Sequence, residues 1–204
     1  MQVRIGFSKR PENDTFADYY VKRRASKIIY HKRFHAQNKM DNNIALVVLD
    51  EPVMFDEHVS PITIFNGATG YDSGHCVASE AGWIKPGNKK VTGIFGGKIH
   101  FIEAPMTDFS LKESLTRVTT YYECRKELAS EVTQKMICAK PDSYEMEGLT
   151  GHFKGNDGGP LVIKVGDMVQ QVGIKSWAYQ GGLYPTVYTR IDSYFDWILD
   201  NITL

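Results

Sequence analysis

The chain has 204 residues, 42% of them hydrophobic and 24% charged, a composition typical of globular proteins that excludes a disordered chain, a collagen and a coiled coil. Its length suits one globular domain, or two small domains fused around a shared interface. Lys plus Arg and Asp plus Glu number 24 each, and this zero net charge argues against a dedicated nucleic-acid-binding protein.

Short strand-like runs recur along the chain, separated by Gly, Pro, Asn and Asp. Several lie only about ten residues apart, which favours an all-β sandwich or barrel over alternating strands and helices. In chain order the predicted strands are Val3–Phe7, Lys27–Tyr30, Ile44–Leu49, Gly74–Ser79, Lys98–Ile102, Leu161–Val165, Gln170–Ile174 and Thr186–Arg190. Apolar periodicity of i, i+3, i+4, i+7 predicts a helix over Ile191–Ile202, and a second short helix is predicted over Glu123–Ser130.

The basic residues gather near the N-terminus. The first 39 residues hold ten Lys or Arg but only three acidic residues, so the rest of the chain carries the compensating acidic excess. One interpretation is a polyanion-binding face over Lys9–Arg33. The other is an ordinary solvated region of strands and loops, which is the commoner use of such charges.

Features that bear on the cellular compartment point in different directions. The longest apolar run, Ile44–Leu49, falls far short of the ~20 residues of a membrane helix, so no membrane span is predicted. The N-terminus has no apolar signal stretch: either the protein is not exported by that route, or the chain lacks its natural start. The sequons at Asn13 and Asn201 are candidate glycosylation sites and hint at secretion.

The most informative stretch is Gly155-Asn156-Asp157-Gly158-Gly159-Pro160, followed directly by Leu161-Val162-Ile163. Its glycines and proline predict a tight turn that enters a buried strand. Glycine also permits positive φ and close backbone approach, so backbone N–H groups can point at one spot. Taken alone, the segment indicates only a turn.

Other motifs give this turn a context. They are Asp41-Asn42-Asn43-Ile44-Ala45-Leu46, Cys76 with Gly82-Trp83, Met136-Ile137-Cys138-Ala139, Gly173-Ile174-Lys175-Ser176-Trp177, and Pro185–Arg190 followed by Trp197-Ile198. In this order, and together with the glycine turn, they resemble the trypsin/chymotrypsin-like serine peptidase family over nearly all of the chain. The resemblance implies an all-β fold of two antiparallel six-stranded β-barrels with a C-terminal helix.

The same resemblance divides the chain 1–204, taken as one peptidase-like domain, into three parts. Residues 1–71 are expected to be the remnant of the first barrel, 72–190 the second barrel and 191–204 the C-terminal helix. The first barrel is expected to be incomplete, because the family's N-terminal segment with its Ala-Ala-His-Cys motif has no counterpart here.

Departures from the family pattern fall on its catalytic triad. Hydrolysis requires a serine nucleophile, a histidine base and an aspartate that orients the base. The resemblance places Asp157 at the serine position and Asn43 at the triad aspartate. His31 and His35 fall in a surface stretch of the family, and His58, His75, His100 and His152 have no partner at a recognisable spacing. We therefore expect no functional triad and no peptidase activity.

Supporting positions of the family's site also differ. The backbone N–H groups of Gly155 and Asp157 would form the oxyanion hole, where a permanent carboxylate repels a developing oxyanion. The specificity-pocket positions implied by the resemblance are Gly151, Ser176, Trp177 and Thr186. Thr186 stands where the family has a glycine, so its β-branched side chain is expected to narrow or fill the pocket. Asn156 replaces the aspartate that pairs with a newly cut N-terminus.

Three cysteines permit at most one disulfide. The resemblance pairs Cys124 with Cys138 and leaves Cys76 as a free thiol. No metal-ligand spacing and no phosphate-binding glycine loop is visible, so no cofactor and no metal are predicted.

The leading hypothesis is a catalytically inactive, secreted serine peptidase homologue that acts by binding a peptidase, a peptidase substrate or an inhibitor. Two alternatives remain. The chain is a truncated or erroneous version of an active endopeptidase, or it is a fragment without an independent role.

Overall fold

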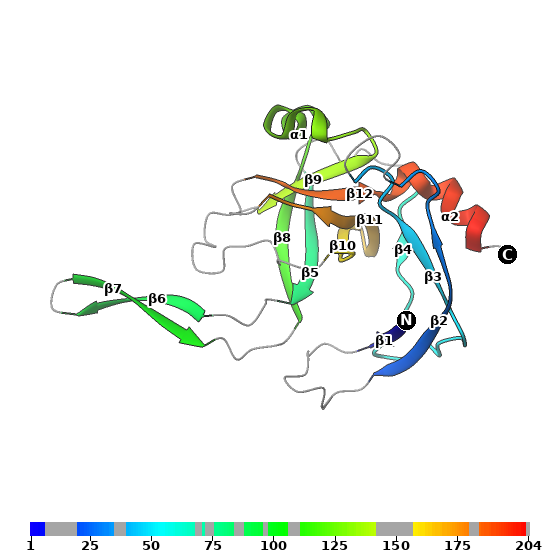
Figure 1. Ribbon diagram of the computed structural model, residues 1–204, viewed down its shortest axis with the longest axis horizontal. Coiled ribbons are helices and arrows are strands. Elements are labelled where there is room, and N and C mark those ends of the chain that lie inside the picture. Colours follow the sequence, from blue (N-terminus) through cyan, green and yellow to red (C-terminus); the bar gives the residue numbers. More distant parts are fainter. Residues whose placement is uncertain are drawn as a thin grey trace.

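The structure is a computed structural model. Its described elements form two sheets, an isolated hairpin and two α-helices (Figure 1). The residues that the structure describes are 1–6, 20–34, 40–67, 71, 76–83, 88–95, 98–105, 111–141, 157–179 and 184–202.

The largest sheet closes into a six-stranded barrel. Its strands follow the order β10-β5-β8-β9-β12-β11, and pairing of β10 with β11 closes the ring. Their bounds are Val77–Trp83 (β5), Leu111–Thr119 (β8), Met136–Pro141 (β9), Pro160–Val165 (β10), Met168–Trp177 (β11) and Thr186–Arg190 (β12). The short β4, Thr63–Ile64, adds to β11 in parallel. Five side chains at the centre of the barrel core have no exposed surface: Val118, Ala139, Leu161, Val172 and Tyr188.

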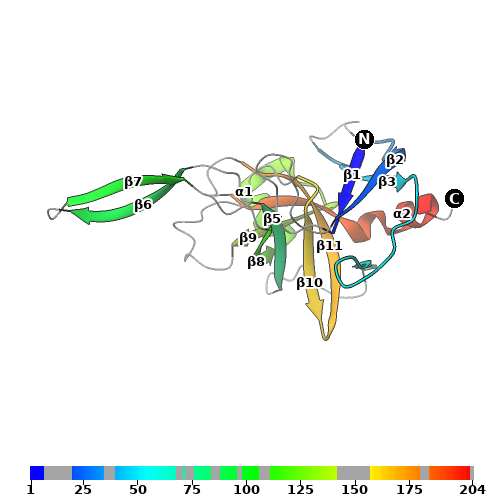
Figure 2. The same cartoon turned by 90° about the horizontal axis from the view of Figure 1, so that it is seen from below.

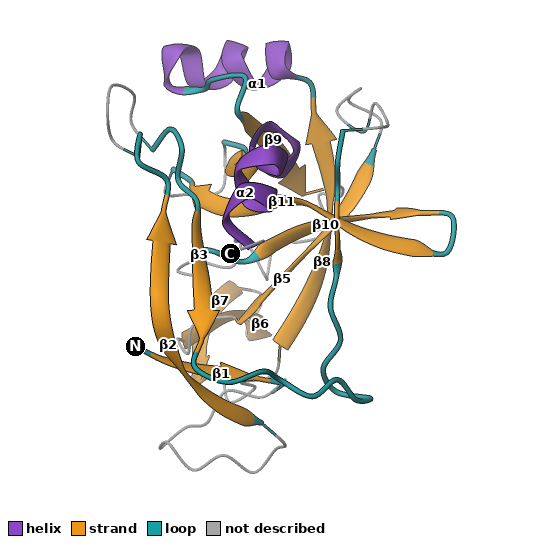
Figure 3. Cartoon of the chain, turned by 90° about the vertical axis from the view of Figure 1, so that its right-hand side faces the viewer, coloured by secondary structure: helices purple, strands orange, loops and turns teal. Residues whose placement is uncertain are grey.

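A three-stranded antiparallel sheet lies beside the barrel (Figure 3). It consists of β1 (Gln2–Ile5), β2 (Val21–Tyr30) and β3 (Ala45–Leu49), with β2 in the middle. None of the residues in these strands is fully buried, whereas four of the five residues of β12 are. This sheet falls within residues 1–71, where the remnant of a first barrel is expected.

An apolar cluster joins the small sheet to the barrel. Ile44, just before β3, packs with Ile191, Tyr194 and Ile198 of the C-terminal segment, and Leu46 of β3 and Ile174 of β11 pack against them. The C-terminal segment is a 3₁₀ turn over Ile191–Tyr194 followed by the helix α2, Phe195–Ile202. The predicted helix over Ile191–Ile202 therefore has the expected span but begins with a tighter turn.

A two-stranded hairpin extends away from the barrel (Figures 1 and 2). Its strands are β6, Asn88–Phe95, and β7, Lys98–Pro105, and among the described residues each pairs with the other alone. This hairpin is called the arm below. Only its second strand was predicted from the sequence.

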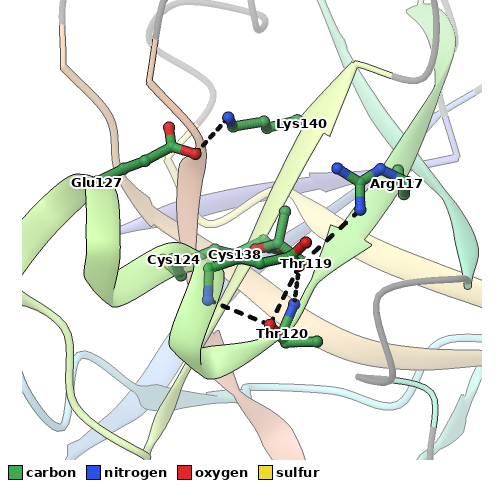
Figure 4. A network of polar contacts seen from close by, with 8 residues as sticks. Arg117, Thr119, Thr120, Cys124, Glu127, Cys138 and Lys140 are labelled. Atoms are coloured by element: carbon green, nitrogen blue, oxygen red, sulfur yellow. Dashed lines mark hydrogen bonds and ion pairs between the residues drawn. A yellow bond between two sulfur atoms is a disulfide. The ribbon is translucent and has the colours of Figure 1, made fainter.

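The helix α1, Tyr121–Leu128, has a capped N-terminus and is joined to the barrel by a disulfide (Figure 4). Thr120 Oγ1 accepts a hydrogen bond from the Glu123 backbone N–H at 3.1 Å, and Glu123 Oε2 accepts one from the Thr120 N–H at 2.9 Å, a complete capping box. The bond from the Thr120 N–H, together with one that the Thr120 hydroxyl donates to Glu123 Oε2 at 3.1 Å, lowers the pKa of the Glu123 carboxyl. Cys124 is bonded to Cys138 of β9, so the predicted disulfide is present. Closing a loop of this length stabilises a fold by about 3 kcal/mol.

Cys76 is a free thiol, as predicted. It precedes β5 and is partly buried against the barrel core. Burial raises the pKa of the Cys76 thiol above its ordinary value.

Strands β6, β8 and β9 and the short β4 were not predicted. β8 lacks the clean apolar alternation of a half-buried strand, because it carries Lys112, Glu113 and Arg117 among its apolar residues. Strand β5 begins at Val77, later than the predicted Gly74, and residues 72–75 lie outside the described residues. The predicted strand Val3–Phe7 is observed as Gln2–Ile5, and Phe7 likewise lies outside.

Burial differs enough between the two sheets to predict their local stability. In the isolated chain, backbone amides of β2 and β3 should exchange with solvent faster than those of β9, β11 and β12. In the described part of the chain, the small sheet has two edges that pair with no further strand, and its strands hold no fully buried residue, so it can open without disrupting the barrel core. Hydrogen exchange followed by mass spectrometry measures this difference, and equal protection of the two regions would contradict it.

Candidate functional site

The site is built on the turn that precedes β3. Asn42 in this turn has a φ of 58°, and its side chain is buried. Its Oδ1 accepts hydrogen bonds from Lys135 Nζ and from the Tyr194 hydroxyl, both at 3.3 Å. The neighbouring Asp41 accepts one from Thr133 Oγ1 at 2.9 Å. These bonds fix the turn to the C-terminal segment and to the loop before β9.

Asn43 connects this turn to two barrel strands. Its Nδ2 donates to Ser176 Oγ of β11 at 2.9 Å, and its carbonyl oxygen accepts from Thr189 Oγ1 of β12 at 2.7 Å. Ser176 and Thr189 are both buried, so the side-chain amide and the backbone carbonyl of Asn43 are each bonded to a buried group of the barrel. The structure thus brings the predicted positions Asn43 and Ser176 together.

Asp157 lies in the turn that leads into β10. The turn needs a glycine at position 158, where φ is 85°. Two backbone hydrogen bonds attach the turn to β11: the Gly158 N–H donates to the Lys175 carbonyl, and the Lys175 N–H donates to the Gly159 carbonyl, both at 2.8 Å. The side chain of Asp157 is left exposed to solvent.

Asn43 and Asp157 line the same hollow, which has a volume of about 440 Å³. They are more than a hundred positions apart in the sequence, and β11 is the strand to which both are tied. Other residues that line the hollow are Tyr30, Phe34, Gln171, Ile174 and Lys175. The walls are therefore partly aromatic and partly polar, as expected of a site that binds part of another molecule.

Lys175 is a residue of this site that the sequence did not single out. It is 6% exposed, although an ammonium group is seldom so deeply buried. In the resembling motif the family has a valine at this position. The signal that could have found Lys175 is that this lysine is the single charged residue of β11.

Of the positions expected to form a specificity pocket, the described ones are buried (Ser176 and Thr186) or partly buried (Trp177). Thr186 is fully buried, and its hydroxyl has no hydrogen-bond partner within the described part of the chain. Trp177 lies 5.8 Å from Tyr179 between ring centroids, and Tyr179 lies 5.4 Å from Tyr184. The Tyr179 hydroxyl donates to Glu131, which raises the pKa of the tyrosine.

Several predicted positions lie outside the described residues. They are the pocket base Gly151, the oxyanion-hole residue Gly155, Asn156, the sequon residue Asn13, and His35, His75 and His152. Their roles remain predictions.

The sequence matches a known protein family over nearly its whole length. A family model described as trypsin matches residues 1–198. The chain belongs to the trypsin family. The resemblance inferred from the motifs is therefore confirmed, and the closed barrel with its partial second sheet and C-terminal helix is consistent with the trypsin-like double barrel.

Similar proteins include trypsins of vertebrates and of a crayfish. The chain is 29% identical to a trypsin of Squalus acanthias over 99% of its own length and 76% of that protein. It is 29% identical to anionic trypsin of Bos taurus, with 87% of this chain and 62% of the relative covered. Trypsin-1 of Astacus astacus is 31% identical, over 86% of this chain and 66% of the relative. The chain thus spans about two thirds to three quarters of these trypsins.

The histidine that a trypsin-family triad requires is not found among the described residues of the hollow, whose lining contains no histidine. His31 packs against the rings of Tyr194 and Trp197, with centroid distances of 5.5 and 5.4 Å. On an exposed loop, His58 Nε2 lies 3.6 Å from Glu57 Oε1. His100 is in the arm.

The basic residues near the N-terminus are partly engaged in the structure. Arg23 donates to the Pro52 carbonyl at 2.9 and 3.2 Å, and Arg24 pairs with Asp50. Arg4 of β1 and Lys22 of β2 stand directly opposite each other, although like charges in this position destabilise a sheet. Lys9 and Arg10 lie outside the described residues.

The described residues offer neither a metal-binding cluster nor a membrane-spanning helix. In the ranges that the structure describes, no three His, Cys, Asp or Glu side chains are grouped so that they could hold a metal ion. Within the same ranges, no helix has the length and apolar character needed to cross a membrane.

His31 makes the stability of the fold depend on pH. Burial, followed by the positive charges of Lys135 and Arg33, lowers the pKa of His31 below the 6.5 of an exposed histidine. The unfolded chain therefore takes up a proton more readily than the folded one below pH 6.5, so the free energy of unfolding should fall as the pH drops through this range.

Denaturant unfolding of the wild type and of His31→Gln between neutral and mildly acidic pH tests this expectation. The variant should show a weaker dependence on pH, whereas His58→Gln, at an exposed site, should behave as the wild type. An unchanged pH dependence in His31→Gln would exclude His31 as the cause.

Proposed function

We propose that this protein is a non-catalytic member of the trypsin family that acts by binding another protein, such as a peptidase, a peptidase substrate or an inhibitor. The observation that carries the proposal is the pair Asn43 and Asp157 in one hollow. The family places its triad aspartate and its serine nucleophile at these two positions.

Asn43 cannot perform the part of a triad aspartate. A carboxylate there accepts the Nδ1–H of the histidine, selects the useful tautomer and stabilises the imidazolium ion, and replacing it by asparagine costs about 10⁴-fold in rate. The amide of Asn43 offers N–H groups instead, and its Nδ2 is engaged with Ser176. An imidazole placed beside it would be oriented in the wrong tautomer.

Asp157 is unsuited to peptide hydrolysis for two further reasons. Peptide hydrolysis passes through an oxyanion that is stabilised by nearby backbone N–H groups, and a permanent negative charge beside that spot repels it. Asp157 also has no hydroxyl to form an acyl-enzyme. The two substitutions together remove both the nucleophile and the group that would orient its base, so binding is the remaining use of the hollow.

The lineage favours a secreted protein whose partners are those of proteolysis, because the similar proteins are trypsins. A disulfide is compatible with an oxidising compartment. Asn201, the described sequon residue, donates from Nδ2 to the Trp197 carbonyl at 2.7 Å, so a glycan at this nitrogen would replace one N–H of that amide. Contact with a polyanion is a second proposal, supported by the adjacent charges of Arg4 and Lys22.

Restoring the serine should not restore catalysis. We expect the Asp157→Ser protein to cleave a mixed fluorogenic peptide library no faster than Asp157→Ala, because a serine hydroxyl is a weak nucleophile without a base and triad members act as a unit. The double variant Asn43→Asp with Asp157→Ser should also be inactive. Cleavage well above the alanine control, or labelling of the wild type by an organophosphonate, would show an active endopeptidase instead.

Binding through the hollow is tested with known members of proteolytic systems. A panel of inactivated trypsin-like peptidases and of their protein inhibitors is titrated against the wild type in a calorimeter. We expect at least one to bind, and Asp157→Arg to weaken that binding at least about tenfold by changing the charge of the hollow.

Tyr122→Arg supplies the matched control, since Tyr122 is 83% exposed on α1, away from the residues of the hollow. Equal loss of binding in both variants would place the interface elsewhere. A panel without any binder would contradict the proposed partner class.

A further inference from the structure

Basic side chains gather on two strands of the small sheet. The described ranges 1–6 and 20–34, which hold β1 and β2, contain no Asp or Glu. Their seven basic residues are Arg4, Lys22, Arg23, Arg24, Lys27, Lys32 and Arg33. The acidic residues of the segment 40–67 instead flank β3, which lies on the other side of β2 from β1. The part of the sheet formed by β1 and β2 is therefore basic.

The register between β1 and β2 brings three of these charges into one row. Arg4 pairs with Lys22, and Gln2 pairs with Arg24. Directly opposite residues of an antiparallel pair lie on the same face, as do alternate residues of one strand. Arg4, Lys22 and Arg24 therefore share a face, and these three residues are called the basic row below. Lys22 and Arg24 are exposed, and Arg4 is partly exposed.

The charges of the basic row are only weakly neutralised. The Arg24 side chain is 87% exposed, and its Nε lies 3.9 Å from Asp50 Oδ2. The other carboxylate oxygen of Asp50 accepts the Arg24 backbone N–H at 2.9 Å. Lys22 Nζ lies 5.3 Å from the centre of the Tyr20 ring, a contact that neutralises no charge. These ammonium and guanidinium groups are therefore available to an anion.

Arg23 shows what a structural arginine does in the same strand. It lies on the other face of β2, where its Nε and Nη2 donate to the Pro52 carbonyl at 3.2 and 2.9 Å. Arg4 and Lys22, in contrast, repel each other across the two strands. An anion bound between them removes that repulsion, so the sheet itself gains stability from such a ligand.

The chemistry of this face favours a narrow, hydrophilic polymer of anions. Alternate residues of a strand lie about 7 Å apart, so the basic row presents its charges along a line. The positions that share the face are Gln2, Arg4, Lys22 and Arg24, which offer no apolar side chain for insertion into a membrane. The Arg24 guanidinium presents a fork of N–H groups that matches the oxygens of a tetrahedral anion. The zero net charge of the chain argues against a nucleic acid.

We propose that the basic row binds a sulfated polysaccharide that lies along β1 and β2. This inference rests on the polyanion contact and the secreted location proposed above, because sulfated polysaccharides are the polyanions of the extracellular space. It does not rest on binding through the hollow. Lys22 and Tyr30, which lines the hollow, are eight residues and therefore about 26 Å apart on β2.

The first test is titration of the full chain with heparin, a sulfated polysaccharide, at low and at physiological salt. We expect binding that weakens as the salt concentration rises, because ions screen exposed charges. Lys22→Glu with Arg24→Glu should weaken binding at least about tenfold. Lys126→Glu with Lys164→Glu is the matched control, since it makes the same change in charge at exposed positions of α1 and β10. The control should weaken binding less than about threefold.

Arg24→Lys separates a defined site from diffuse attraction. This variant keeps the charge but loses the guanidinium fork, so it should weaken heparin binding at least about threefold. Its thermal unfolding should match that of the wild type, because the Arg24 side chain is exposed. An unchanged affinity in Arg24→Lys would show that charge alone attracts heparin and would overturn the site.

Three further probes identify the class of polyanion. They are unsulfated hyaluronan, a single-stranded oligonucleotide and vesicles that contain phosphatidylserine, and heparin should bind more tightly than any of them. Tighter binding of the oligonucleotide or of the vesicles would overturn the sulfated ligand while keeping a polyanion contact. Binding of none of the four would refute that contact as well. Equal losses in the two double variants would place the heparin site outside the basic row.

Discussion

Closure of the barrel depends on the backbone of β11. This strand pairs with β10 on one side, with β12 on the other and, over two residues, with β4. The same strand carries Ser176 to the amide of Asn43 and binds the Asp157 turn through the backbone of Lys175. If β11 shifted in register by one residue, the barrel would lose its closing pairs and the two positions in the hollow would separate. The closure of the barrel and the geometry of the site therefore both depend on the register of β11.

The geometry of the site is physically compatible with the proposed absence of a triad. The groups that support the site are mostly backbone N–H and carbonyl groups, or hydroxyls such as that of Thr189, and they are needed to satisfy buried polar atoms whatever chemistry follows. Asn43 fits the same network by donating from its side-chain amide to Ser176. A scaffold of this kind can lose its reaction and keep the shape of its cleft.

The sequence predicted the strands whose apolar residues form clean runs, such as Leu161–Val165 and Thr186–Arg190, and the apolar periodicity of the C-terminal segment. It did not predict β8, where charged residues interrupt the run, or β6, because pairing in the arm depends on its neighbour β7. The contact between Asn43 and Ser176 was not predicted, since no local pattern encodes a contact across 133 positions. Burial of Lys175 depends on the neighbours of β11 and could not be predicted from its own segment.

The three cysteines also have a consequence for how the chain oxidises. Three thiols can form three different disulfides, of which one is native. Thiol–disulfide exchange proceeds through the thiolate, and the raised pKa of Cys76 keeps that thiol protonated once the barrel has formed. Cys124 and Cys138 are 14 residues apart in the sequence. Cys124 lies in α1, near its capped N-terminus, and Cys138 lies in β9. The odd thiol is thus made less reactive by the barrel core, which is a different apolar cluster from the one that surrounds the native disulfide.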